Sequence, residues 1–104
     1  MTDNIFYLPP NLPNEEVFEK IAGSDRVLIE RIISTGQTTP PGEWYDQERD
    51  EWVIVLQGKA QLVYDDGATI NLSAGDYLLI PARQKHRVGY TSSDPPCIWL
   101  AIHF

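Results

Sequence analysis

The sequence predicts an all-β fold, an antiparallel barrel or sandwich, and three observations support this. Short apolar runs recur from residue 26 to the C-terminus. From residue 51 onward, turn residues interrupt them roughly every eight to ten positions. Prolines and most glycines lie between the runs, where a strand ends. Regular spacing of this kind is typical of antiparallel β architectures.

The one stretch that resembles a helix is residues 14–23, "NEEVFEKIAG". Asn14 is suited to cap its N-terminus, and two glutamates follow in the first turn. Apolar residues recur on one face, and Gly23 is suited to end the helix. We therefore expect a short N-terminal helix.

The remaining runs are predicted strands joined by tight turns. Gly58 and the pair Asp66-Gly67 are strong hairpin signals. The breaker-rich segment 35–43 forbids regular structure. The predicted strands are 26–34, 51–57, 60–64, 69–72, 77–81, 85–91 and 97–104.

The length of 104 residues fits a single domain. We expect one domain over 1–104, with an N-terminal arm and helix over 1–25 and a barrel over 26–104.

Composition excludes several classes of partner. The net charge is −7 and no basic stripe is present, so nucleic acid is not expected. No apolar run is long enough to span a bilayer, so no membrane is expected. The single cysteine, Cys97, suits a reducing compartment, and the N-terminus lacks the features of a signal peptide. We expect a cytoplasmic protein.

Two stretches resemble the motifs of the small single-domain bacterial cupins, the cupin 2 conserved barrel family. In the first, Glu51 is followed by six residues and Gly58. In the second, Gly75 is followed by five residues and Pro81, and His86 comes five positions later. The resemblance covers roughly residues 26–104. It implies an antiparallel double-stranded β-helix, the cupin or jelly-roll barrel, with a divalent metal inside.

The sequence departs from the family where the first motif has two histidines. With the commoner spacing these positions are Tyr45 and Gln47. With a spacing one residue longer they are Trp44 and Asp46. Both histidines are therefore replaced. The resemblance still implies a mixed set of metal ligands, which would be Glu51, His86, Gln47 and Tyr45.

Each of these residues also has a simpler interpretation. Glu51 is either a solvated strand end or a buried carboxylate, since Val53 and Val55 share its face by strand alternation. His86 is either a hydrogen-bonded structural residue or a ligand. Carboxylate, imidazole and amide ligands suit Zn, Ni, Mn or Fe without choosing among them.

Three further residues are candidates for the wall of the pocket. His103 lies on the last predicted strand, where by alternation it shares a face of mixed polarity with Cys97, Trp99 and Ala101. Tyr90 continues the face of His86 by strict alternation, and Arg83 stands where the family motif usually has glycine.

We expect a barrel that binds a divalent metal, a small polar molecule or both. The resemblance implies isomerase, decarboxylase or dioxygenase chemistry if the protein is an enzyme. The alternatives are a non-catalytic ligand-binding module and a metal-free acid–base enzyme that uses Glu51 and His86. We also expect a homodimer, because apolar surface on 26–34 and 97–104 exceeds what one barrel interior needs.

Overall fold

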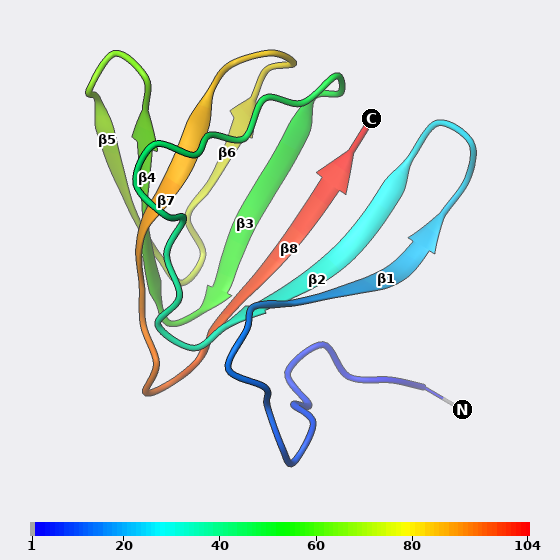
Figure 1. The fold of residues 1–104 in the computed structure, drawn as a ribbon. Coiled ribbons are helices and arrows are strands. Elements are labelled where there is room, and N and C mark those ends of the chain that lie inside the picture. Colours follow the sequence, from blue (N-terminus) through cyan, green and yellow to red (C-terminus); the bar gives the residue numbers. More distant parts are fainter. Residues whose placement is uncertain (1) are drawn as a thin grey trace.

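The computed structural model describes residues 2–104, which form eight strands and no helix (Figure 1). The all-β prediction is confirmed, and each run predicted as a strand corresponds to one observed strand. The strands are β1 (Val17–Gly23), β2 (Leu28–Ser34), β3 (Glu51–Gln57), β4 (Lys59–Tyr64), β5 (Thr69–Ser73), β6 (Tyr77–Ile80), β7 (His86–Thr91) and β8 (Cys97–His103). Residues 2–104 therefore contain no helix that is long and apolar enough to cross a membrane.

The strands form two antiparallel sheets that enclose the core (Figure 1). The larger sheet has the order β1-β2-β8-β3-β6, and the smaller has the order β5-β4-β7. Strand β8, the last in the chain, lies in the middle of the larger sheet. The core packs side chains such as Val55 and Trp99 from the larger sheet against Ala60 and Leu62 from the smaller one.

The predicted N-terminal helix is wrong, because the same residues form β1 along the edge of the larger sheet. Val17 lies opposite Ile33 of β2, and the pairing continues to Gly23. The register shifts between Lys20 and Ala22, so an extra residue interrupts the two-residue alternation of the strand. The helix-like spacing of Val17, Phe18 and Ile21 is therefore accommodated by a strand with a bulge at residue 21.

Gly58 closes the hairpin between β3 and β4 with a backbone that favours glycine. Its φ is +82°, in the left-handed region. A Cβ at this position would lie 3.0 Å from Cα of Cys97 and would collide with the hydroxyl of Ser92. The motif glycine is therefore fixed by both conformation and space.

The segment between β2 and β3 has almost no regular structure but runs beside β7 (Figure 1). The amide of Thr39 donates to the carbonyl of Val88 over 3.0 Å. Tyr45 and His86 exchange two backbone hydrogen bonds of 2.7 and 3.1 Å. These bonds hold residues 45 and 47 at the opening of the barrel.

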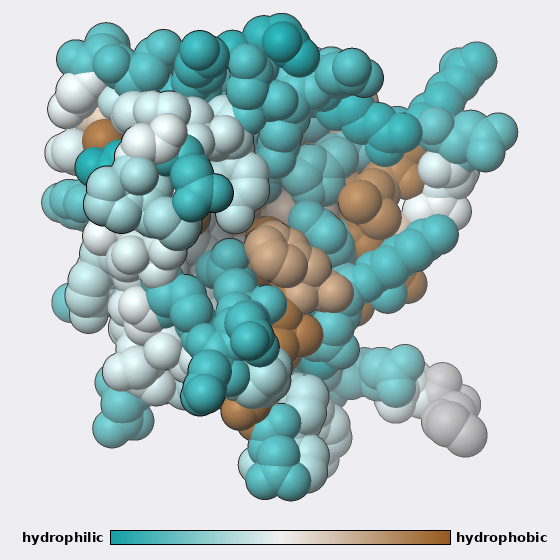
Figure 2. Space-filling view, viewed as in Figure 1, coloured by the Kyte–Doolittle hydropathy of each residue, from teal (hydrophilic) through white to brown (hydrophobic). Residues whose placement is uncertain are grey.

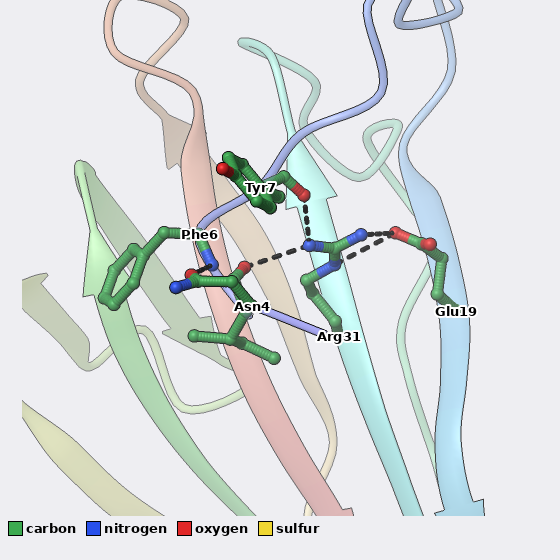
Figure 3. Close-up of polar contacts among 6 residues, drawn as sticks. Asn4, Phe6, Tyr7, Glu19 and Arg31 are labelled. Atoms are coloured by element: carbon green, nitrogen blue, oxygen red, sulfur yellow. Dashed lines mark hydrogen bonds and ion pairs between the residues drawn. The ribbon is translucent and has the colours of Figure 1, made fainter. Parts of the chain in front are cut away.

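The N-terminal segment is held on the outer face of the larger sheet by Arg31 of β2 (Figure 3). The guanidinium donates to the carbonyls of Ile5 and Tyr7, at 2.9 and 2.6 Å. It also forms an ion pair of 2.7 Å with Glu19 of β1. A buried arginine needs such partners, and here they attach the arm to the barrel.

Candidate functional site

A cavity of about 60 Å³ lies between the two sheets and contains both histidines of the chain. We call it the inner cavity. Its polar residues come from several strands, and its floor is apolar. On the face shown in Figure 2, apolar residues lie in a hollow with hydrophilic residues around it. Among the residues that line the inner cavity are Tyr45, Gln47, Glu51, His86 and His103.

Glu51 is buried at the start of β3 and is not a solvated strand end. It lies between Ile80 of β6 and His103 of β8 and is only 7% exposed. Its same-face neighbours Val53 and Val55 are fully buried, as alternation predicts. Burial raises the pKa of the Glu51 carboxyl above its ordinary value, although the two nearby imidazoles act in the opposite direction.

His86, at the start of β7, presents its free ring nitrogen to Glu51. Its Nδ1 lies 3.0 Å from the carbonyl oxygen of Gln84. A carbonyl only accepts, so Nδ1 carries a proton, and in the neutral ring Nε2 then has a lone pair. Nε2 lies 3.8 Å from Oε1 of Glu51, too far for a direct hydrogen bond. A small group of a ligand can therefore contact both side chains.

Tyr45 and Gln47 both reach the inner cavity from the segment before β3. The rings of Tyr45 and His86 stack, with centroids 5.5 Å apart. Burial, together with the negative charges of Glu16 and Glu51, raises the pKa of the Tyr45 phenol. The phenol therefore stays protonated and acts as a hydrogen-bond donor, not as an anionic ligand.

His103 also lies in the inner cavity, where it contacts a carboxylate that the sequence analysis did not single out. Its Nε2 lies 2.8 Å from Oε1 of Glu30 on β2, and both side chains are largely buried. The sequence contained a signal for Glu30, because by strand alternation it shares the inner face of β2 with Leu28 and Ile32.

Glu16 is a second carboxylate that the sequence analysis did not identify as a site residue. The hydroxyl of the fully buried Ser34 donates to its carboxylate. The same hydroxyl accepts a hydrogen bond of 3.0 Å from Nε1 of Trp99. Burial raises the pKa of Glu16, while the bond from Ser34 opposes this shift. No local sequence pattern predicts this chain of contacts, which joins three distant segments.

Arg83 and Tyr90, both predicted in the pocket wall, do not line the cavity. Arg83 has a φ of +67°, and its side chain turns outward to pair with Asp46 at 3.1 Å. Its backbone amide nevertheless donates to the carbonyl of Gln47 and so helps to position that residue. Tyr90 is 52% exposed because the β4–β7 register skips Gly89, which reverses the alternation after Val88.

Cys97 has no part in the site. It is fully buried, and burial raises the pKa of its thiol to about 12. The thiol therefore stays protonated and behaves as a small apolar residue.

The residues present do not fit the metal site that the family resemblance implies. Among residues 2–104, no three His, Cys, Asp or Glu side chains come together as a metal-binding group. Glu51 and His86 supply two donor atoms, but the Gln47 side chain is hydrogen-bonded to Glu51. Nε2 of His103 is engaged by Glu30. Tyr45 keeps its proton. The chemistry of the site is therefore that of its own side chains.

Two antiparallel sheets around a cavity with polar side chains above an apolar floor define a class of small β-barrel proteins with an internal site. The sequence model of the family described as "Cupin domain" matches residues 31–103. The chain belongs to the cupin family. No curated protein matches it in sequence.

Solved structures support this assignment. A protein from Ralstonia eutropha JMP134, named as a proposed mannose-6-phosphate isomerase, is 39% identical with a TM-score of 0.92; the match covers 99% of this chain and 96% of that one. A cupin superfamily protein from Desulfitobacterium hafniense DCB-2 is 24% identical with a TM-score of 0.76, covering 92% and 83%. A cupin with a double-stranded β-helix fold from Methanocaldococcus jannaschii is 18% identical with a TM-score of 0.72, covering 99% and 91%. The predicted fold family is confirmed.

Proposed function

We propose that the protein catalyses proton transfer, of the isomerase type, on a small polar molecule, with Glu51 and His86 as the acid–base pair. The observation that carries this proposal is the Glu51–His86 pair itself. A buried carboxyl with a raised pKa lies 3.8 Å from an imidazole whose other nitrogen is fixed by a carbonyl. A carboxyl with a perturbed pKa that faces an imidazole in a cavity is typical of catalytic sites.

The chemistry needs one proton held between the two side chains. With the Glu51 carboxyl protonated, as its raised pKa favours, and the Nε2 lone pair of His86 free, Nε2 removes the proton from a carbon next to a carbonyl of the substrate. The Glu51 carboxyl donates its proton to the carbonyl oxygen, and an enediol forms. His86 then returns the proton from Nε2 to the neighbouring carbon, and Glu51 takes a proton from the adjacent hydroxyl. Atoms and charges balance, and no redox partner is required.

Other residues of the inner cavity are suited to orient the substrate. Tyr45 offers a protonated phenol, and Gln47 offers an amide that both donates and accepts hydrogen bonds. The apolar floor formed by residues such as Val53 and Trp99 excludes water from the reacting atoms.

The name of the protein from R. eutropha supports the reaction type. That protein is 39% identical to this chain, and its name refers to an isomerase. Conversion of an aldose to a ketose is a proton transfer next to a carbonyl, which is the step that an acid–base pair performs. The name does not carry over the substrate, which depends on the pocket of this chain.

The experiment is hydrogen exchange in D₂O with a panel of small α-hydroxy aldehydes and ketones, followed by proton NMR. We expect the wild type to exchange the carbon-bound proton of at least one compound. Glu51→Gln and His86→Gln should slow this exchange by about 10²–10⁴-fold, the usual contribution of a positioned acid or base. The exposed Glu48, outside the inner cavity, provides the matched control Glu48→Gln, which should exchange at the wild-type rate.

Three results would contradict the proposal. Exchange that persists in Glu51→Gln would remove the carboxylate from the mechanism. Exchange that a chelator abolishes, with a stoichiometric metal found by elemental analysis, would assign the chemistry to a metal. Binding of a panel compound without exchange would make the protein a non-catalytic ligand-binding module.

A further inference from the structure

A second and larger cavity, of about 480 Å³, adjoins the inner one. We call it the outer vestibule. Glu16, Phe18, Tyr45 and Val88 line both cavities, so the two lie side by side, and we refer to them together as the recess. The inner cavity is too small for a whole sugar-sized molecule, whereas the outer vestibule has the volume of an ordinary small-molecule pocket. The body of a ligand therefore fits outside, with one group reaching inward.

The outer vestibule combines aromatic rings with carboxylates. Phe18 and Trp44, which line it, are 53% and 38% exposed. Glu15, Glu16 and Glu43 lie in the same wall. Among the described residues, no lysine or arginine lines either cavity. Exposed aromatic side chains around a recess mark a binding surface, and the uncompensated carboxylates define its charge.

A fixed carboxylate at the junction of the cavities carries the negative charge of the recess. Glu16 is half-buried there and is oriented by Ser34, which is itself fixed by Trp99. Among the described residues, no lysine, arginine or histidine lies within ion-pair distance of the Glu16 carboxylate. A carboxylate held in a recess without a cation at contact distance favours a positively charged partner.

The aromatic wall already holds a cation in the structure. The guanidinium of Arg87 lies 5.7 Å from the centroid of the Trp44 ring. Cations within about 6 Å of an aromatic ring are attracted by its negative face, and tryptophan gives the strongest such interaction. The net charge of −7 would also draw cations, and not anions, toward the recess.

We propose that the outer vestibule binds the ammonium group of a small organic cation, between the rings of Phe18, Trp44 and Tyr45 and next to the carboxylate of Glu16. This inference rests on the proposed function, because it names the class of substrate that the same recess accepts. The same walls are poorly suited to a phosphate group. Glu15, Glu16 and Glu43 would repel it, and the guanidinium of Arg87 packs on the Trp44 ring and lines neither cavity.

The test uses three probes that separate charge from shape. Choline has a permanent positive charge, 3,3-dimethylbutan-1-ol is its neutral carbon isostere, and inorganic phosphate is the anion. Each is titrated into ¹⁵N-labelled protein, and the amide and indole signals are followed by NMR. We expect choline to shift the Trp44 indole and Tyr45 amide signals, with an affinity at least tenfold higher than that of the isostere. Phosphate should not shift them.

Variants then assign the selectivity to a residue. Glu16→Gln should reduce the preference for choline over its isostere to less than threefold and leave the affinity for the isostere unchanged. Glu48→Gln, the exposed control, should keep the preference. Equal affinity for both compounds, no binding of choline, or binding of phosphate at these signals would overturn the inference. If exchange that depends on Glu51 is present in any of these cases, the proposed function stands and only the substrate class is wrong.

Discussion

Replacement of Ser34 by alanine tests the contact chain that orients Glu16. The Ser34 hydroxyl accepts from Nε1 of Trp99 over 3.0 Å and donates to the Glu16 carboxylate, and Ser34 is fully buried. Ser34→Ala leaves the indole donor buried without a partner, at a cost of about 1–3 kcal/mol. The carboxylate loses a bond as well, so we expect the upper half of that range, about 2–3 kcal/mol. With a urea m-value of about 2 kcal/mol/M, the unfolding midpoint should fall by about 1 M or slightly more.

A double-mutant cycle with Trp99→Phe isolates the indole contact. In the Trp99→Phe background no donor is left unpaired, so Ser34→Ala should cost about 1 kcal/mol less than in the wild type. Ser73→Ala, at an exposed serine of β5, is the control and should change stability by less than about 0.5 kcal/mol. Equal costs of Ser34→Ala in both backgrounds, or a cost no greater than that of Ser73→Ala, would refute the contact chain.

Three further predictions concern turn geometry, linked protonation and assembly. Gly58→Ala should lower the free energy of unfolding in urea by about 1–3 kcal/mol more than Gly67→Ala does. Both glycines have positive φ, but only a Cβ at position 58 would collide with Ser92. Equal effects of the two substitutions would contradict this prediction. The raised pKa of Glu51 contributes stability at low pH that is lost as the pH rises through that pKa. The free energy of unfolding of Glu51→Gln, compared with that of wild type, should therefore be larger at pH 8 than at pH 4. A difference between variant and wild type that is the same at both pH values would contradict the linkage. We still expect a homodimer, and Tyr77, which is 65% exposed on the edge strand β6, is a position at which to test it. Light scattering should give a dimer mass for the wild type and a lower mass for Tyr77→Lys. A monomer mass for the wild type at micromolar concentration would contradict the prediction.

The barrel strands were predictable because their signals are local. Turn residues such as Gly58 and Gly67 adopt the positive φ that hairpins require, and the apolar runs between them alternate as strands do. The burial of Glu51 followed from the same alternation, since Val53 and Val55 share its face.

Bulges account for the two errors of register. A bulge in β1 lets residues 17–21, whose apolar spacing resembles a helix, form a strand, and the skipped Gly89 in β7 turns Tyr90 away from the cavity. A bulge depends on the partner strand, so alternation within one segment does not reveal it.

The remaining site residues depend on long-range contacts. Glu16 reaches the recess because β1 pairs with β2, and it is held there by Ser34. His103 meets Glu30 because β8 lies between β2 and β3. A single sequence contains no local pattern for such pairings, although strand alternation places Glu30 on the inward face of its strand.

The measurement that tests the central claim most directly is a ¹³C NMR titration of the Glu51 side-chain carboxyl in protein prepared without added metal. The signal is assigned by its loss in Glu51→Gln. An acid–base pair with a buried carboxyl predicts a midpoint above about 4.3, the ordinary value for glutamate, and a further rise in His86→Gln because a cationic neighbour is removed. A midpoint at or below the ordinary value, or one that His86→Gln does not move, would contradict the account; a depressed value is the effect that a bound metal ion would have.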